Sequence, residues 1–206
     1  MHRNSERLFS ERAAHLIQPG WRVLEVGPDA HPSTFERAVR VETIWESAEL
    51  VTEMERWAAT AASEVAWPMT DPYVIPANDS TFDAVVSGNV LEHVERPWRW
   101  MPELARVVRP GGLVVTVAPV SWPYHEAPVD CWRAYPAGMR ALSEDAGLEV
   151  LTAEWACLEN GARRSYPGSA WNDKVWGWAY RWAKIKALTG WPTPVAYDAI
   201  TIARKI

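Results

Sequence analysis

The chain has 206 residues, a formal net charge of −5 at pH 7 and a sequence pI of about 5.6. This length supports one α/β domain over residues 1–206 and is too short for two, while the acidic balance excludes the basic surface that binds nucleic acid or anionic membranes. No apolar run is long enough for a membrane span, the polar N-terminus lacks the apolar region of a signal peptide, and Cys131 and Cys157 have no metal or disulfide spacing, so we expect a cytoplasmic protein.

The expected elements alternate between helices and strands along the chain. The patterns predict a helix over 4–17, strands over 21–26 and within 38–45, a helix over 47–62 and a short strand over 64–69. A fourth strand over 82–87 ends at Gly88, a helix begins near Val90, another covers 102–108 after two interrupting prolines, and a fifth strand covers 113–118. This alternation predicts right-handed crossovers and a parallel sheet whose ligands bind beyond the carboxyl ends of the strands.

The last quarter of the chain differs in composition. We expect an N-terminal helical region over 1–20, a core over 21–150 and a final region over 151–206 with strands near 147–156 and 195–203. Between those strands lies a Trp-rich insertion over 160–191, with a helix around 171–187. This aromatic segment either packs on the core or on a second copy of the chain, as in a homodimer, or forms a wall over a substrate pocket.

A buried charge marks the end of the first strand. Glu25 lies within the apolar run Val23–Val26, directly before Gly27 and Pro28, and buried strands rarely carry a charge without a ligand or partner. The second and third glycines of a dinucleotide-binding turn are absent, and Asp29 would repel a pyrophosphate. The pattern therefore indicates a nucleotide-type cofactor site, and a cofactor that carries an amino acid and a sulfonium in place of the pyrophosphate is compatible with Asp29.

Four segments in this order resemble the class I S-adenosylmethionine-dependent methyltransferases. The resemblance is to the methyltransferase type 11-like group, which has an acidic residue and glycine after strand one and LEHV after strand four. It covers about 21–150 and rests on VLEVGP (23–28), STFDAVVSGNVLEHV (80–94), LARVVRPGGLVVTVAP (104–119) and HEAPVDCWRAYPAGMRAL (125–142). It implies a Rossmann-like doubly wound α/β fold, with a mostly parallel seven-stranded sheet and helices on both faces, and S-adenosyl-L-methionine as cofactor.

The resemblance also implies cofactor-binding residues. Glu25 holds the amino end of the methionine, and Gly27 and Pro28 form the adjoining turn. An acid at the end of strand two holds the ribose, which we assign to Glu46 over Glu42 by a small margin. The remaining positions are Asp71 for the adenine amino group with Pro72 or Tyr73 against the ring, and Ser87, Gly88 and Asn89, whose carbonyls contact the methionine. Asn89 fits a helix cap equally well, and Asp83 reads as a structural turn residue.

Two histidines are the candidate catalytic residues. His125 lies in the polar loop after strand five, where the family places its acceptor, whereas His93 belongs to LEHV and fits a positioning role better. The substrate-binding candidates in that loop are Trp122, Tyr124, Asp130, Trp132 and Arg133. Arg133 could instead pair with Asp130 and orient the loop. Two potential metal ligands, His125 and Asp130, fall short of a site, so no metal is expected.

These features predict transfer of a methyl group to a small molecule. The acceptor that we favour is a hydroxyl of a sugar or secondary metabolite, methylated by direct in-line displacement with no covalent enzyme intermediate. The alternatives are an N- or C-methyltransferase of a small molecule and a non-catalytic domain that binds S-adenosylmethionine or a nucleoside. We expect no nucleic acid and no membrane among its partners.

Overall fold

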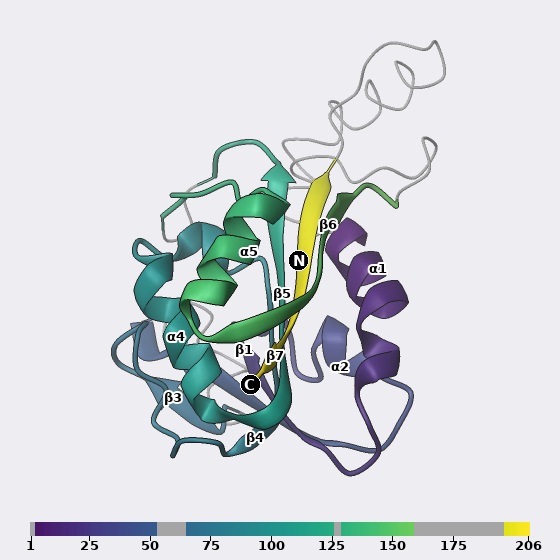
Figure 1. Ribbon diagram of the computed structural model, residues 1–206, viewed down its shortest axis with the longest axis vertical. Coiled ribbons are helices and arrows are strands. Elements are labelled where there is room, and N and C mark those ends of the chain that lie inside the picture. Colours follow the sequence, from purple (N-terminus) through teal and green to yellow (C-terminus); the bar gives the residue numbers. More distant parts are fainter. Residues whose placement is uncertain (1–2, 53–64, 126–128, 159–195) are drawn as a thin grey trace.

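A computed structural model describes residues 3–52, 65–125, 129–158 and 196–206. Seven strands form one sheet in the order β3-β2-β1-β4-β5-β7-β6 (Figure 1). The strands are β1 Arg22–Val26, β2 Ile44–Leu50, β3 Trp67–Met69, β4 Phe82–Gly88, β5 Val108–Ser121, β6 Leu148–Ala156 and β7 Tyr197–Lys205. The first five run parallel, and β7 pairs antiparallel with both β5 and β6. The predicted Rossmann-like fold is confirmed.

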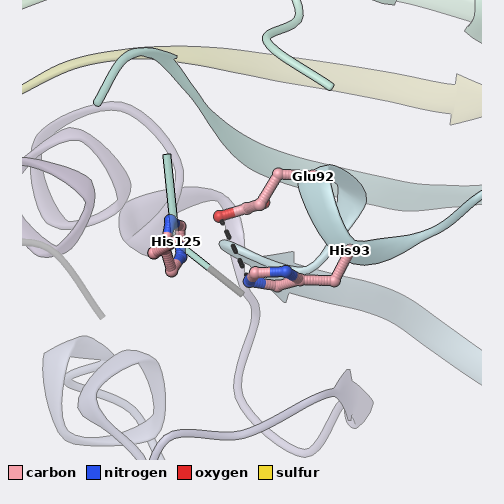
Figure 2. Close-up of side chains that lie close together, drawn as sticks. All are labelled: Glu92, His93 and His125. Atoms are coloured by element: carbon pink, nitrogen blue, oxygen red, sulfur yellow. Dashed lines mark ion pairs between the residues drawn. The ribbon is translucent and has the colours of Figure 1, made fainter. Parts of the chain in front are cut away.

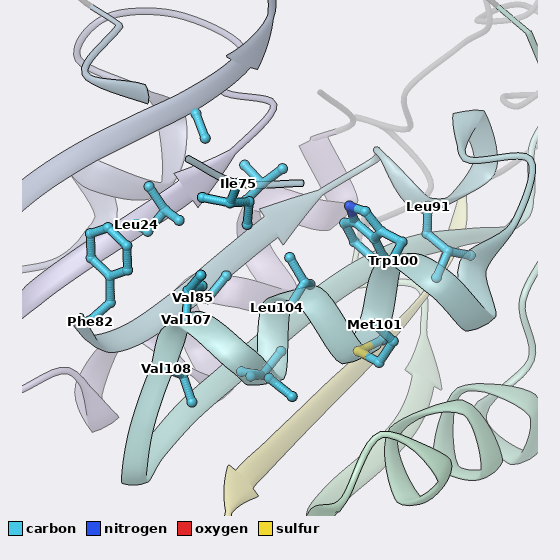
Figure 3. Close-up of a cluster of buried hydrophobic side chains, with 14 of the residues drawn as sticks. Leu24, Ile75, Phe82, Val85, Leu91, Trp100, Met101, Leu104, Val107 and Val108 are labelled. Carbon is cyan, nitrogen blue, oxygen red and sulfur yellow. The ribbon is translucent and has the colours of Figure 1, made fainter. Parts of the chain in front are cut away.

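Helices cover both faces of this sheet. One apolar cluster joins α1 (Arg3–Arg12), the 3-10 turn η1 (Ala14–Leu16) and α2 (Thr34–Ala38) to one face, where Val23 packs with Phe9 and Phe35. The other face carries α4 (Pro97–Val107) and α5 (Pro136–Asp145), with Leu24, Trp100 and Leu104 in the core (Figure 3). Successive residues of a strand point to opposite faces, so strands buried on both faces read as the continuous apolar runs seen in the sequence.

The second strand lies further along the chain than predicted. The strand expected within 38–45 is β2, 44–50, so the helix expected over 47–62 is wrong for its first four residues. Pairing with β1 overrides the helical propensity of this stretch, since Ile44 to Ala48 align with Arg22 to Val26. Helical structure begins at Val51, and 53–64 lie outside the described residues.

The other differences concern the ends of strands and helices. Strand β5, expected over 113–118, covers Val108–Ser121. The N-terminal helix ends at Arg12 and continues as the separate turn η1, and the segment expected to start a helix near Val90 is the 3-10 turn η2, Leu91–His93. Helix α4 begins at Pro97, which is tolerated in a first turn, and contains Pro102 within it. The last two strands were predicted close to their positions, whereas the insertion over 160–191 lies outside the described residues. No helix in the described ranges is long and apolar enough to cross a membrane.

The carboxyl ends of β1 and β4 meet in two tight turns. Gly27 and Asn89, which directly follow these strands, both have positive φ angles, 69° and 57°. The Gly27 amide donates to the Ala48 carbonyl of β2, and the Asn89 amide donates to the Val117 carbonyl of β5. A Cβ at Gly27 would overlap the side chain of Val90. Glycine is therefore needed at 27 both for its conformation and for the close approach of the two turns.

Gly112 provides a test of how closely β4 and β5 approach at their amino ends. A Cβ there would lie 2.5 Å from the Asp83 carbonyl oxygen and 2.9 Å from that of Arg109, both backbone atoms that cannot move aside alone. We expect Gly112→Ala to lower the free energy of unfolding by about 1–3 kcal/mol in urea titrations. The control, Gly138→Ala in α5, meets no atom within 4 Å and should be neutral or stabilising. Equal unfolding midpoints for wild type and Gly112→Ala would contradict this packing.

Candidate functional site

The cofactor residues expected on β1 and β4 lie side by side. In the parallel register Glu25 pairs with Val86 and Val26 with Ser87, and the Ser87 hydroxyl donates to the Val26 carbonyl over 3.1 Å. Gly27, Gly88 and Asn89 follow at the same edge of the sheet. Parallel pairing thus brings together two motifs that are some sixty residues apart in the chain, at the edge where such sheets bind ligands.

Glu25 is wholly buried with one oxygen left unpaired. Its Oε2 accepts hydrogen bonds from the Ser33 hydroxyl and from Trp45 Nε1, the latter at 2.9 Å, while Oε1 has no hydrogen-bond partner among the described residues. Burial raises the pKa of Glu25 to about 7, against the effect of these two hydrogen bonds. A buried carboxylate oxygen without a donor is costly unless a ligand supplies one. The ammonium of a methionine is such a donor, so Glu25 fits the methionine end of S-adenosylmethionine.

Asp29 stands near the place where a second glycine of a nucleotide-binding turn would come. Its carboxylate accepts from the Thr34 amide at 2.9 Å and from the Thr34 hydroxyl at 2.6 Å. Ser33 caps the same helix, α2, in a capping box with Glu36. The turn after Gly27 and Pro28 is therefore held by side chains rather than by additional glycines.

The assignment of Glu46 to the end of strand two is wrong. Glu46 lies in the middle of β2, opposite Leu24, and its carboxylate accepts from Arg22 Nε and Trp67 Nε1, each at 2.6 Å. Burial acts to raise its pKa, but these hydrogen bonds outweigh it and hold the pKa of Glu46 below its ordinary value. Its rival Glu42 precedes the strand, and its carbonyl accepts from the Gly20 amide at the opposite edge of the sheet.

Glu49 is the acidic residue at the carboxyl end of β2. It directly follows Ala48, whose carbonyl accepts from Gly27, and one of its oxygens accepts from the Leu50 amide at 2.8 Å. Sequence reasoning missed Glu49 because the strand was placed several residues too early. Ser47 and Ala48 are both buried, but the stretch does not alternate between apolar and polar residues, so the sequence held no clear signal for the true register.

Asp71 follows β3 at the same edge of the sheet. Its Oδ1 accepts from the Tyr73 amide at 2.8 Å and its carbonyl from the Val74 amide, which forms a tight turn that contains Pro72. The Arg99 guanidinium lies 4.4 Å from the centre of the Tyr73 ring. The turn thus lies beside the end of β2, and contact of Asp71 with adenine stays a prediction.

Many polar groups of the loop after β5 form hydrogen bonds to other groups of the same loop. Both oxygens of Asp130 accept from the Arg133 guanidinium, one at 2.6 Å, and the His125 amide donates to Asp130 at 2.9 Å. Arg133 also donates to the Trp122 carbonyl, and Trp132 Nε1 donates to the Val94 carbonyl. The Asp130–Arg133 ion pair that orients the loop is confirmed.

Some of the predicted substrate-binding residues are already bonded to other groups of the protein. The Asp130 side chain is 1% exposed, and the Arg133 guanidinium is bonded to Asp130 within the loop. The indole N–H of Trp132 is bonded to Val94, next to η2. Tyr124 is 69% exposed and Trp132 38% exposed, so both present aromatic surface to a ligand. Substrate binding by these residues and by Trp122 stays a prediction.

Glu92, His93 and His125 form a cluster beside the turn at Asn89 (Figure 2). The two imidazole centres are 5.0 Å apart, and His93 Nε2 lies 3.9 Å from Glu92 Oε1. Glu92 is wholly buried, and neither of its oxygens has a hydrogen-bond partner among the described residues. Burial raises the pKa of Glu92 to about 8, while burial and the neighbouring His93 lower the pKa of His125 below its ordinary value. Sequence reasoning singled out both histidines and missed Glu92, although it lies in the same LEHV motif.

Glu25 predicts a specific pH dependence of stability. Its pKa is raised in the folded state from 4.5 to about 7, so the folded protein loses stability relative to the unfolded chain as the pH rises between these values. The Glu25→Gln variant lacks this pH dependence. Its free energy of unfolding in urea should therefore increase relative to that of wild type by about 3 kcal/mol from about pH 4.5 to 7.5. Glu46→Gln is the control of opposite sign. Because folding lowers the pKa of Glu46, its charged carboxylate stabilises the folded state above the pKa of the unfolded chain, and this stabilisation is lost in acid. Parallel pH profiles for wild type and Glu25→Gln would contradict the burial of this charge.

Known proteins with similar sequences are methyltransferases. The family model described as a methyltransferase domain matches residues 32–116. An uncharacterized methyltransferase of Mycobacterium tuberculosis is 51% identical over 41 residues, which are 20% of this chain and 16% of that protein. The match therefore spans only about a sixth of the length of such curated relatives.

Solved structures share the fold at low sequence identity. The [4+2]-cyclase SpnF superposes with a TM-score of 0.60 at 18% identity and covers 97% of this chain and 81% of its own. Phosphoethanolamine N-methyltransferase 2 of Haemonchus contortus, solved in complex with S-adenosyl-L-methionine, gives a TM-score of 0.52 at 13% identity and covers 92% of this chain and 49% of its own.

The edge of the sheet at the carboxyl ends of β1 and β4, which we call the cofactor edge, agrees with the four sequence motifs. The matching domain model and the shared fold agree with them too. Glu25 supplies an unpaired acceptor at the position that the motif requires, and S-adenosylmethionine is the cofactor that this arrangement fits. The chain has the fold and the domain signature of the class I S-adenosylmethionine-dependent methyltransferases.

Proposed function

We propose that this protein transfers the methyl group of S-adenosylmethionine to a small-molecule acceptor, and that the acceptor atom is a hydroxyl oxygen of a sugar or secondary metabolite. The observation that carries the proposal is the cluster of Glu92, His93 and His125 on the loops after β4 and β5. It adjoins the turn at Asn89, next to the cofactor residues of β1. Proton-accepting groups are thereby available beside the cofactor edge, where an acceptor hydroxyl would need them.

The cofactor would be held along the ends of four adjacent strands. Glu25 Oε1 would accept from the methionine ammonium, and the backbone of Gly27 and Ser87–Asn89 would line the methionine. In this proposal Glu49 replaces Glu46 as the acid that binds the ribose hydroxyls, because Glu49 lies at the carboxyl end of β2. Asp71, at the end of β3, would accept from the adenine amino group. S-adenosylmethionine supplies an electrophilic methyl group on its sulfonium.

His125 is our candidate for the group that takes the acceptor's proton. In the transfer an O–CH₃ bond forms, the S–CH₃ bond breaks, and the hydroxyl proton must leave the oxygen. His125 Nδ1 lies 3.3 Å from the Pro123 carbonyl and 3.4 Å from Asp130 Oδ2, which favours a proton on Nδ1 and a lone pair on Nε2. The lowered pKa of His125 keeps it neutral near pH 7, so Nε2 can accept the proton.

An amine acceptor is the second candidate. The Haemonchus contortus neighbour is a phosphoethanolamine N-methyltransferase, and an amine that arrives as the free base does not need His125. A non-catalytic binding domain has no comparable use for buried Glu92 beside two histidines. The turnover of the His125→Ala variant therefore tests whether the acceptor is a hydroxyl or a free amine.

The ribose assignment can be tested without knowledge of the acceptor. We expect Glu49→Gln to weaken binding of S-adenosylhomocysteine by about 1–3 kcal/mol in calorimetric titrations, because a carboxylate that bonds two hydroxyls is lost. Glu46→Gln is the matched control, since its carboxylate bonds Arg22 and Trp67 instead. It should bind the ligand like wild type while unfolding more readily. The opposite ranking of the two variants would return the ribose to Glu46.

The role of His125 needs an acceptor, which a screen of hydroxylated sugars and secondary metabolites with methyl-labelled cofactor can supply. We expect His125→Ala to lower turnover by about 10²–10⁴-fold with nearly unchanged cofactor affinity. His15→Ala, an exposed histidine in η1, is the control and should keep full turnover. If His125→Ala turns over at nearly the wild-type rate, alignment alone drives the transfer. The 121–133 loop would then serve substrate binding only.

A further inference from the structure

The cluster of Glu92, His93 and His125 has the composition of a metal site. One potential ligand atom from each residue lies within 4.8 Å of the other two (Figure 2). Two imidazoles and one carboxylate are a donor set that suits Zn²⁺ and other divalent first-row transition metals. We propose that Glu92, His93 and His125 together bind one such ion.

The surroundings of both histidines favour ligation through Nε2. His93 Nδ1 bonds the Val129 carbonyl, and His125 Nδ1 lies 3.3 Å from the Pro123 carbonyl. A carbonyl oxygen can only accept, so in each ring the proton belongs on Nδ1 and the lone pair on Nε2. Histidines that bind metals usually donate their second N–H in this way, which fixes the orientation of the ring. The loop thus holds both rings as a metal site requires.

Glu92 supplies the independent observation that calls for a cation. Its carboxylate is 0% exposed, and both oxygens lack a hydrogen-bond partner among the described residues. Burial acts most strongly against its charged form, and the nearby carboxylates of Asp198 and Asp130 add to this effect. The backbone N–H of Glu92 itself favours the charged form, as does the guanidinium of Arg133, which is bonded to Asp130. A buried carboxylate in such a place is stabilised by a positive charge that it contacts directly.

The distances allow closure around an ion. Ligand atoms of a tetrahedral Zn²⁺ with bonds of about 2.0–2.1 Å lie about 3.3 Å apart, and the Glu92–His93 pair is already at 3.9 Å. To bind the ion, the ligand atom of His125 would move closer to those of Glu92 and His93. The His125 side chain is 34% exposed and lies in the loop after β5. Three protein ligands leave a fourth position for water or an acceptor oxygen.

This inference goes beyond the proposed function and changes one of its assignments. A bound ion would occupy the lone pair on Nε2 of His125, so His125 would not take the proton in the loaded protein. The ion would instead stabilise the deprotonated acceptor oxygen, and the proton would leave to solvent beside the partly exposed loop. The sequence alone did not suggest a site, because it paired His125 with Asp130. In the structure Asp130 bonds Arg133 and lies on the Nδ1 side of His125, whereas Glu92 and His93 form the cluster with His125.

The test measures metal content and requires neither cofactor nor acceptor. The full chain, without a histidine tag, is stripped with a chelator and dialysed to equilibrium against Zn²⁺ and, separately, Mn²⁺. We expect one ion per chain for at least one of these metals, and a visible absorption band of tetrahedral type when Co²⁺ is added. Glu92→Gln and His125→Ala should each weaken binding at least tenfold, while His15→Ala binds like wild type.

Two results would overturn the metal site. Absence of stoichiometric binding of both metals would leave the cluster as a proton-binding site and leave the proposed function intact. Binding that survives in both Glu92→Gln and His125→Ala would mark an adventitious surface ion. If Glu92→Gln fails to fold, as circular dichroism would reveal, His125→Ala decides the question, because His125 lies in a partly exposed loop. If the wild-type chain does not bind S-adenosylhomocysteine, this result would count against the proposed function and not against the metal site.

Discussion

The parallel register of β1 between β2 and β4 is the constraint on which the rest of this structure depends. It fixes Val26 opposite both Ala48 and Ser87, and the next amide, that of Gly27, donates to Ala48. A shift by one residue would turn Glu25 from the face of α2 to the face of α4, away from Ser33 and Trp45. The ends of the central strands, and the residues there that we propose to bind the cofactor, are thereby placed by backbone pairing rather than by the loops.

Two buried carboxylates mark the two ends of the candidate site. Glu25 and Glu92 are both 0% exposed, and each has at least one oxygen without a hydrogen-bond partner in the described part of the chain. Apolar side chains at these positions would stabilise the fold more, since burial opposes the charge of both. The protein therefore carries a cost in stability at the two places where the proposed function needs a cation or a proton. Such costs are typical of functional sites.

The sequence predicted the fold better than the site. Long apolar strands such as β4 and β5 are buried on both faces, so their pattern depends on little else and was read correctly. Strand β2 carries polar residues and good helix formers, and only its pairing with β1 decides its extent. The error there moved the ribose assignment to Glu46 and concealed Glu49. Contacts between distant loops, such as Glu92 and His93 with His125, have no local signal in the chain.

The loop after β5 shows how a dense polar sequence can serve both structure and chemistry. Its internal ion pair, Asp130 with Arg133, ties the backbone at Trp122 and His125, and the indole of Trp132 ties it to η2. Density of polar groups alone thus did not distinguish substrate contacts from loop scaffolding. The scaffolding matters for function, because a histidine held at both its amide and its Nδ1 has little freedom to lose when it meets a ligand. In the proposed function, the residues that fix the loop therefore act on the chemistry through the position of His125.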